Sequence, residues 1–272
     1  MSDLPGRVHL VAGGFPPGSP AGHDHDYARF RILEMLQEDS IPASVSSDFV
    51  DVERWLPLSK LMITYTAGPV LDARQAGLVN DWLLSGGRWL ALHGTSGGKA
   101  ARVEGSRQRV MVKLPHHETM GGFFINHPPV RKFRVDLADS KHPLTKGLPD
   151  SFEVIDEPYM VEVLDLDRSE VFLTSELGPD ASPPGFGFAY EKDTALLPDG
   201  KTRVIAYSKE VGKGAVAYTT LGHCHSPSTN SQPFVDANVA ADGKTPALMR
   251  TTWEVPAYGQ LLRNGISWGI GS

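Results

Sequence analysis

The segment DARQAGLVNDWLLSGGRWLALHG, residues 72–94, contains a helical pattern followed directly by an apolar strand-like run. Residues 72–85 have the apolar spacing of one helical face, and Asp72 is suited to cap the helix. Two glycines end the helix, and residues 88–93 (RWLALH) are typical of a strand that is covered on both faces. A helix and a strand joined by so short a link indicate a βαβ unit in a parallel sheet.

The residues before this segment repeat the same alternation. Strands are predicted at residues 7–14 (RVHLVAGG), 44–50 and 61–67, and a helix is predicted over residues 27–37. The first half of the chain therefore predicts an α/β protein with a mostly parallel sheet that is flanked by helices.

The second half has a different pattern, with strand-like runs and little helix between them. These runs lie at residues 133–137, 153–163, 171–177, 203–211 and 215–221. A glycine-flanked turn joins the last two runs, which predicts additional antiparallel strands.

A terminal amphipathic helix is predicted around residues 258–268, and its aromatic residues are compatible with a homo-oligomer. Residues 95–122 and 226–255 fit no regular element, and long loops of this kind are usually lids or flexible excursions. No repeat or linker divides the chain, so residues 1–272 are expected to form one α/β domain.

The charge and cysteine content exclude several classes of protein. A net charge of -6 and a pI of about 5.9 argue against nucleic acid or an anionic membrane surface as a partner. No apolar run approaches the roughly 20 residues that span a bilayer. The first residues show no secretory signal and Cys224 is the single cysteine, so we expect a cytoplasmic location.

Histidines follow several of the predicted strands. His25, His93 and His223 each come just after a strand, and the carboxyl ends of parallel strands meet at one edge of a sheet, where ligands bind. Asp156 and Glu157 lie in a strand-like run, where a carboxylate needs a partner. Such imidazoles and carboxylates suit zinc or another divalent metal, or metal-free acid–base catalysis.

Each of these residues has a structural alternative. For most single histidines a hydrogen-bonded structural role is the default, and we assign that role to His9, His116, His117 and His142. Cys224 lies between two histidines, but neighbours in an extended segment point to opposite faces, which favours an inert buried thiol. The glycine pairs form neither a dinucleotide fingerprint nor a phosphate loop, so no nucleotide is expected.

Taken in order, the motifs of this chain resemble the ThuA-like (trehalose-utilisation) family of the class I glutamine-amidotransferase-like superfamily. The matching segments span nearly the whole chain: Gly13-Gly14 with His25-Asp26, residues 86–94 (GGRWLALHG), 121–128 (GGFFINHP), 142–148 (HPLTKGL), 156–159 (DEPY), 212–214 (GKG) with 218–223 (YTTLGH), and 264–268 (NGISW).

This resemblance implies a flavodoxin-like sheet with extra strands. It places His93 where related amidotransferases carry a cysteine nucleophile, so glutamine hydrolysis through a thioester is not expected. It also implies that five side chains share a pocket and that the protein acts in carbohydrate catabolism, including that of keto-sugars. The five are His25, His93, His127, Glu157 and His223. His23 is the alternative to His25. Asp26 and the predicted helix that follow His25 favour His25.

The leading hypothesis is an enzyme that hydrolyses, eliminates or isomerises a sugar, glycoside or keto-sugar. His93 and Glu157 would form an acid–base pair, or would bind a divalent metal, zinc above all, beside the other histidines of that pocket. The expected substrate contacts are Asp26, Asn126, Asp156 and Tyr159. Two alternatives are a non-catalytic sugar-binding or regulatory module and, ranked third, a hydrolase that depends on Cys224.

Overall fold

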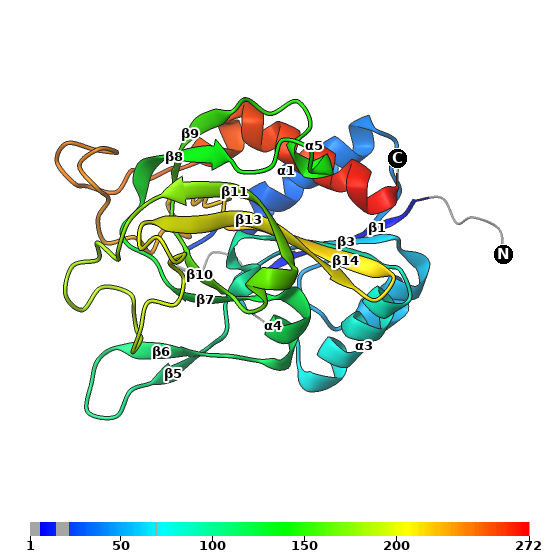
Figure 1. Ribbon diagram of the computed structural model, residues 1–272, viewed down its shortest axis with the longest axis horizontal. Helices are drawn as coiled ribbons and strands as arrows, with labels where there is room; N and C mark the ends of the chain where they lie inside the picture. The colour runs from blue at the N-terminus through cyan, green and yellow to red at the C-terminus, as the bar shows by residue number, and fades with distance from the viewer. Residues whose placement is uncertain (1–5, 15–21, 69, 272) are drawn as a thin grey trace.

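A nine-stranded sheet in the order β2-β1-β3-β4-β14-β13-β11-β8-β9 forms the centre of the protein (Figure 1). The computed structural model describes residues 6–14, 22–68 and 70–271. The strands of this sheet are Val8–Gly13 (β1), Ala43–Ser46 (β2), Leu61–Thr66 (β3), Arg88–Leu92 (β4), Arg131–Leu137 (β8), Ser151–Asp156 (β9), Ser169–Glu176 (β11), Thr202–Val211 (β13) and Gly214–Thr219 (β14).

The sheet has a parallel half and an antiparallel half, as the sequence predicts. Strands β2, β1, β3, β4 and β14 run parallel to one another, in a flavodoxin-like order. A tight turn at Gly212 and Lys213 reverses the chain between β13 and β14, and β11, β8 and β9 continue the antiparallel pairing.

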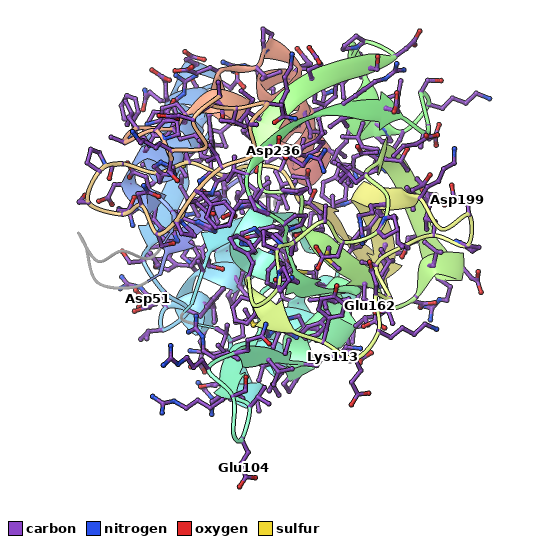
Figure 2. All side chains as sticks on the ribbon, turned by 90° about the vertical axis from the view of Figure 1, so that its left-hand side faces the viewer. Asp51, Glu104, Lys113, Glu162, Asp199 and Asp236 are labelled. Carbon is purple, nitrogen blue, oxygen red and sulfur yellow. The ribbon has the colours of Figure 1, made fainter. Side chains whose placement is uncertain are left out.

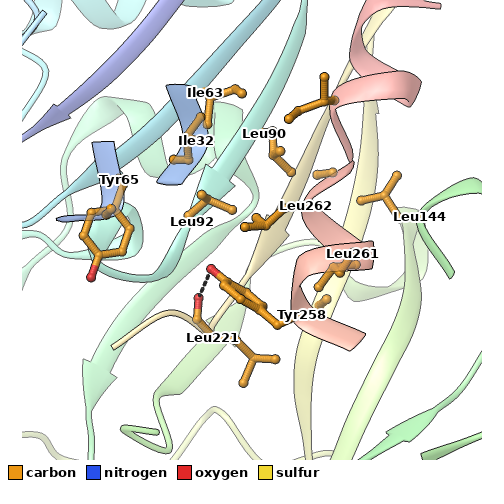
Figure 3. Close-up of a cluster of buried hydrophobic side chains, with 14 of the residues drawn as sticks. Ile32, Ile63, Tyr65, Leu90, Leu92, Leu144, Leu221, Tyr258, Leu261 and Leu262 are labelled. Carbon is orange, nitrogen blue, oxygen red and sulfur yellow. Dashed lines mark hydrogen bonds between the residues drawn. The ribbon is translucent and has the colours of Figure 1, made fainter. Parts of the chain in front are cut away.

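Helices cover both faces of the parallel half. His25–Glu38 (α1) and Pro256–Ile270 (α5) pack on one face, where Leu261 and Leu262 meet Leu90 and Leu92 of β4 (Figure 3). Val52–Trp55 (α2) and Ala73–Leu84 (α3) pack on the opposite face. Among the described residues, no helix combines the length and the apolar character needed to cross a membrane.

The predicted helix over residues 72–85 is confirmed as α3. The Asp72 side chain accepts a hydrogen bond from the Gln75 backbone at 2.8 Å, and the Gln75 side chain accepts one from the Asp72 backbone at 3.0 Å. This capping box satisfies backbone groups that the first helical turn leaves free. Short 3₁₀ helices complete the set: Leu56–Leu58, His93–Ser96, Pro143–Thr145, Leu166–Arg168 and Thr251–Glu254.

Two predicted segments differ from the structure. The strand expected over residues 153–163 is two strands, because β9 ends at Asp156 and Pro158 has no N–H to continue a ladder. The second strand, Met160–Val163 (β10), pairs instead with Gly122–Asn126 (β7) in a separate small sheet. The strand expected over residues 44–50 ends earlier, at Ser46.

Residues 95–122, expected to be irregular, contain regular structure. Lys99–Arg102 (β5) and Arg109–Val112 (β6) form an antiparallel hairpin, which Phe188–Ala189 (β12) extends. Pro115–Met120 (α4) follows the hairpin. The short strands and the polar residues between them explain why no apolar periodicity marks this part of the sequence.

Candidate active site

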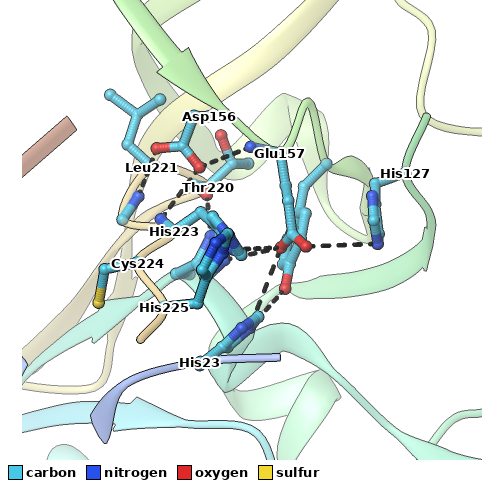
Figure 4. Close-up of polar contacts among 12 residues, drawn as sticks. His23, His127, Asp156, Glu157, Thr220, Leu221, His223, Cys224 and His225 are labelled. Atoms are coloured by element: carbon cyan, nitrogen blue, oxygen red, sulfur yellow. Dashed lines mark hydrogen bonds and ion pairs between the residues drawn. The ribbon is translucent and has the colours of Figure 1, made fainter. Parts of the chain in front are cut away.

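Three imidazoles and one carboxylate meet beside the carboxyl ends of β4 and β14. The ligand atoms of His23, His93, Glu157 and His223 all lie within 4.8 Å of one another, and all four residues are buried (Figure 4). His93 directly follows β4 and His223 lies in the segment after β14, so two neighbouring parallel strands place both rings at one edge. Glu157 comes from the end of β9, in the antiparallel half of the sheet.

The backbone at His93 has an unusual conformation. Its φ is 45°, in the left-handed region that residues with a Cβ rarely adopt. The next residue is Gly94, where an added Cβ would lie 2.4 Å from the Thr66 carbonyl oxygen. The Tyr218 hydroxyl donates to the His93 carbonyl oxygen at 2.9 Å and holds this turn. A strained conformation fixed by its surroundings is a recurrent feature of functional sites.

The hydrogen bonds of His93 define its tautomer. Its Nδ1 lies 2.6 Å from the Thr220 carbonyl oxygen, which can only accept, so Nδ1 carries a proton. The other nitrogen, Nε2, lies 3.0 Å from the Glu157 Oε2. In the neutral ring, His93 therefore directs a lone pair at a carboxylate oxygen.

His223 is oriented through a second histidine. His225 Nε2 donates to the Pro246 carbonyl oxygen at 2.8 Å, and burial lowers the pKa of His225, which keeps its ring neutral. His225 Nδ1 must then accept from His223 Nε2, which is 2.9 Å away. The remaining nitrogen of His223, Nδ1, is left unprotonated and lies 3.3 Å from Glu157 Oε2.

His127 repeats this arrangement on the other oxygen of the carboxylate. Its Nδ1 donates to the Pro128 carbonyl oxygen at 2.8 Å, and its Nε2 lies 3.6 Å from Glu157 Oε1. His93, His223 and His127 thus each use one ring nitrogen as a donor and turn the other nitrogen toward Glu157. Two acceptors that face each other need a proton or a cation between them.

The electrostatics of the cluster favour a charged carboxylate. Burial would raise the pKa of Glu157, but the neighbouring imidazoles of His223, His127 and His93 hold it well below its usual range. Burial acts to lower the pKa of His93, yet the Glu157 hydrogen bond and the Asp156 and Glu157 carboxylates raise it. The cluster therefore attracts positive charge.

Asp156 holds the cluster together without entering it. Its carboxylate accepts from the backbone N–H groups of Glu157 at 2.8 Å, Gly222 at 2.8 Å and His223 at 3.0 Å. These bonds connect the end of β9 to the segment after β14. Asp156 is fully buried, so the predicted substrate contact is corrected to a role in positioning Glu157 and His223.

An open pocket of about 640 Å³ leads to the cluster. His23, His127, Glu157 and Tyr159 lie along it, whereas His93 and His223 are fully buried behind them. Aromatic and polar side chains from strands β6, β7 and β12 and from two loops complete its walls: Arg109, Phe124, Phe188, Phe186 and Gln232. The Gln232 amide donates to Glu157 Oε1, so the loop of residues 226–255 reaches the cluster.

Of the two candidate histidines near the first helix, the structure places His23 in the cluster. The His23 Nε2 lies 3.2 Å from the Tyr159 hydroxyl and 4.0 Å from Glu157 Oε2. His25 begins α1, directly after the N-cap Asp24, and its ring lies close to Gly14. Burial lowers the pKa of His25 to about 4. The preference for His25 is therefore corrected: the structure brings His23 into the cluster and leaves His25 outside it.

The other predicted substrate contacts divide in the same way. Tyr159 lies along the pocket, and its role as a substrate contact stays a prediction. Asp26 is exposed on α1 and pairs with Arg29 at 2.6 Å, which removes it from the site. Asn126 is buried behind the wall, where its Oδ1 accepts from the Phe188 backbone at 2.9 Å. Asn126 thus positions the pocket wall and does not face the cavity.

Cys224 and the histidines assigned structural roles lie outside the cluster. Burial raises the pKa of the Cys224 thiol to about 12, and the thiol lies 3.4 Å from the Tyr65 hydroxyl. His9 and His142 contact Ser44 and Ser208, each at 2.9 Å. His117 lies 3.1 Å from the Ser96 carbonyl oxygen.

Sequence reasoning missed five residues of the site: His225, Gln232, Arg109, Phe186 and Phe188. For His225 a signal existed, because residues two apart in an extended segment share a face, and His223 and His225 have that spacing. The other residues lie on loops and a short hairpin whose approach to the site has no periodic signal.

The comparisons with known proteins agree with this fold. The family ThuA, described as trehalose utilisation, matches residues 20–239. A ThuA-like protein from Bacteroides uniformis superposes with a TM-score of 0.63 at 15% identity, over 99% of this chain and 93% of that one. A ThuA-like protein from Parabacteroides merdae gives a TM-score of 0.57 at 13% identity, over 98% and 90%.

A glutamine amidotransferase from Thermotoga maritima has the same fold, with a TM-score of 0.54 at 10% identity over 98% of this chain and 99% of that one. No curated protein matches the chain by sequence. The flavodoxin-like sheet, the ordered motifs and the match over residues 20–239 show that this chain belongs to the ThuA (trehalose utilisation) family.

Proposed function

We propose that this protein is a metal-dependent enzyme that acts on a sugar, glycoside or keto-sugar derivative. His23, His93, Glu157 and His223 would bind one divalent ion, and zinc suits this set of ligands best. The observation that carries the proposal is the orientation of the imidazoles. His93 and His223 each use one nitrogen as a donor within the protein and direct the other at Glu157.

The distances from Glu157 to two of the imidazoles, His93 and His223, fit an ion of this size. With zinc–nitrogen distances near 2.0–2.1 Å, neighbouring ligand atoms of a tetrahedron lie about 3.4 Å apart. From Glu157 Oε2 the distances are 3.0 Å to His93 Nε2, 3.3 Å to His223 Nδ1 and 4.0 Å to His23 Nε2. Hydrogen bonds from ligating imidazoles to backbone carbonyls, such as that from His93 to Thr220, are typical of metal sites.

The pocket supports a carbohydrate as the substrate. Its volume is in the range of small-molecule sites, and its walls combine aromatic rings with a few polar groups. Phe124 and Tyr159 lie with ring centroids 4.5 Å apart beside the cluster and present an apolar surface to a sugar ring. The family description, trehalose utilisation, supports the same class of ligand.

The two roles that the sequence left open for His93 differ in their fit to this geometry. His93 is fully buried behind the pocket, which favours a ligand over a group that meets the substrate directly. His127 has 14% of its side chain exposed and lies along the pocket, so its Nε2 can give or take a proton there. A bound divalent ion would supply Lewis-acid activation of a water or of a sugar oxygen.

Metal content tests this proposal directly. Protein purified without a histidine tag would be analysed by plasma mass spectrometry, with His93→Ala and His223→Ala beside the control His142→Ala, which changes a buried histidine outside the cluster. We expect near-stoichiometric metal in the wild type and the control, and its loss in both cluster variants. Wild-type protein that is metal-free and whose melting temperature ignores added zinc would contradict the proposal.

A further inference from the structure

The β5–β6 hairpin, residues Lys99–Val112, is strongly basic in an otherwise acidic chain. With the adjoining Lys113 it carries five cationic side chains and a single acid, Glu104, which projects at its tip (Figure 2). Lys113 pairs with Glu162 at 2.8 Å. Within the described part of the chain, the other cations of the hairpin have no ion-pair partner: Lys99, Arg102, Arg107 and Arg109.

One face of this hairpin is directed at the pocket. Ala100, Arg109 and Met111 all lie along the cavity that leads to the cluster. In the antiparallel pairing, Met111 is opposite Ala100 and Arg109 is opposite Arg102, so these four side chains share one face. Lys99 has the alternate position and belongs to the other face of the hairpin.

Arg102 and Arg109 form a like-charged pair at directly opposed positions. Such a pair destabilises a sheet unless an anion lies near it. The Phe188 ring also helps to orient Arg109. The Arg109 guanidinium lies 5.4 Å from the centroid of this ring, and Phe188 is paired with Arg109 in the ladder between β12 and β6. The hairpin therefore holds a positioned, unneutralised cation at the pocket wall.

The rest of the pocket offers nothing to neutralise this charge. Among the described residues along the cavity, Glu157 is the one acid, and it is 2% exposed and engaged with imidazoles and Gln232. We propose that the pocket binds an anionic sugar whose carboxylate or phosphate group pairs with Arg109, supported by Arg102. The planar guanidinium suits two-pronged binding of either group. This inference rests on the proposed function for the sugar part of the ligand.

Binding of defined probes tests the inference. Calorimetry would compare glucose, glucuronate and glucose 6-phosphate on the wild-type protein, at low ionic strength and at about 0.15 M salt. We expect at least one anion to bind about tenfold more tightly than glucose. Arg109→Gln should abolish that preference without weakening glucose, and Arg109→Lys should retain part of it. The matched control Lys99→Gln, on the other face of the hairpin, should keep the preference.

Each outcome decides the matter. A preference for glucuronate alone identifies a carboxylate, and one for glucose 6-phosphate alone identifies a phosphate. Equal binding of all three sugars, or an equal loss of preference in Lys99→Gln and Arg109→Gln, would overturn the inference. Because binding and not turnover is measured, a metal-free protein that prefers an anion through Arg109 would refute the metal site and leave the anion site standing.

Discussion

His225 Nδ1 lies 2.9 Å from His223 Nε2, and this contact decides which nitrogen of His223 faces Glu157. The proton between the two rings belongs to His223, because His225 uses its own proton on the Pro246 carbonyl oxygen. His225 thereby acts on the cluster without contacting Glu157.

Replacing His225 should therefore weaken metal binding without removing a ligand. We expect His225→Ala to lower zinc affinity about 10- to 100-fold, the usual effect of losing a group that orients a ligating imidazole. Competition with a chromogenic chelator measures this affinity. His142→Ala is the matched control, and equal affinities in the wild type and His225→Ala would show that the hydrogen bond is not needed.

Added zinc should stabilise the folded protein, and Glu157→Gln should remove this effect. A ligand present at about 100 times its Kd stabilises by about 2.7 kcal/mol, which a melting curve resolves. The amide keeps the shape of the side chain but not its charge, so the imidazoles lose their anionic partner. A zinc-dependent shift of the same size in Glu157→Gln would argue against Glu157 as a ligand.

Gly94→Ala should disturb both stability and the site. Its new Cβ would be 2.4 Å from the Thr66 carbonyl oxygen, and relief of that overlap must move the turn that carries His93. We expect a loss of about 1–3 kcal/mol in the free energy of unfolding, together with weaker zinc binding.

Gly77→Ala is the control for that substitution. Gly77 lies inside α3 and an added Cβ would meet nothing within 4 Å, so this change should stabilise the protein by about 0.5–1 kcal/mol. Urea denaturation of both variants gives the comparison. Similar effects of the two substitutions would contradict the steric argument.

Acid should destabilise the protein in part through His9, far from the site. Burial lowers the pKa of His9 from 6.5 to about 4, so the unfolded chain binds a proton there before the folded protein does. Stability contributed by neutral His9 is complete above pH 6.5 and is lost as the pH falls toward 4. His9→Gln should flatten the slope of unfolding free energy between these values, and an unchanged slope would rule out His9 as the cause.

The parallel half of the fold could be predicted because each of its elements has a periodic local signal. The apolar runs of β1, β3 and β4 and the capped pattern of α3 need no long-range information. The β5–β6 hairpin lacks such a signal, since its strands are short and largely exposed. The predicted strand over residues 153–163 is interrupted after Asp156, near Pro158. Only the pairing of β10 with β7 shows that this proline separates two strands of different sheets.

The site was predictable to the level of residue types and sheet edge. Topology brings His93 and His223 together, and the family motif adds Glu157 and His127. The choice between His23 and His25 depended on the residue at which α1 begins. Sequence pattern places such a boundary only to within a few residues, which is as large as the separation of the two histidines. Contacts such as His225 with Pro246 span a loop without regular structure, so sequence pattern alone does not reveal them.

The bridge that Asp156 makes between β9 and the segment after β14 has a consequence for how the protein matures. The imidazoles come from the parallel half of the sheet and the first loop, while the carboxylate comes from the antiparallel half, so neither half alone contains the set. Tight metal capture would then be a late event, which follows docking of the halves and reports that folding is complete. A folding intermediate whose two halves have not docked would lack the complete set of metal ligands, and it would therefore be inactive.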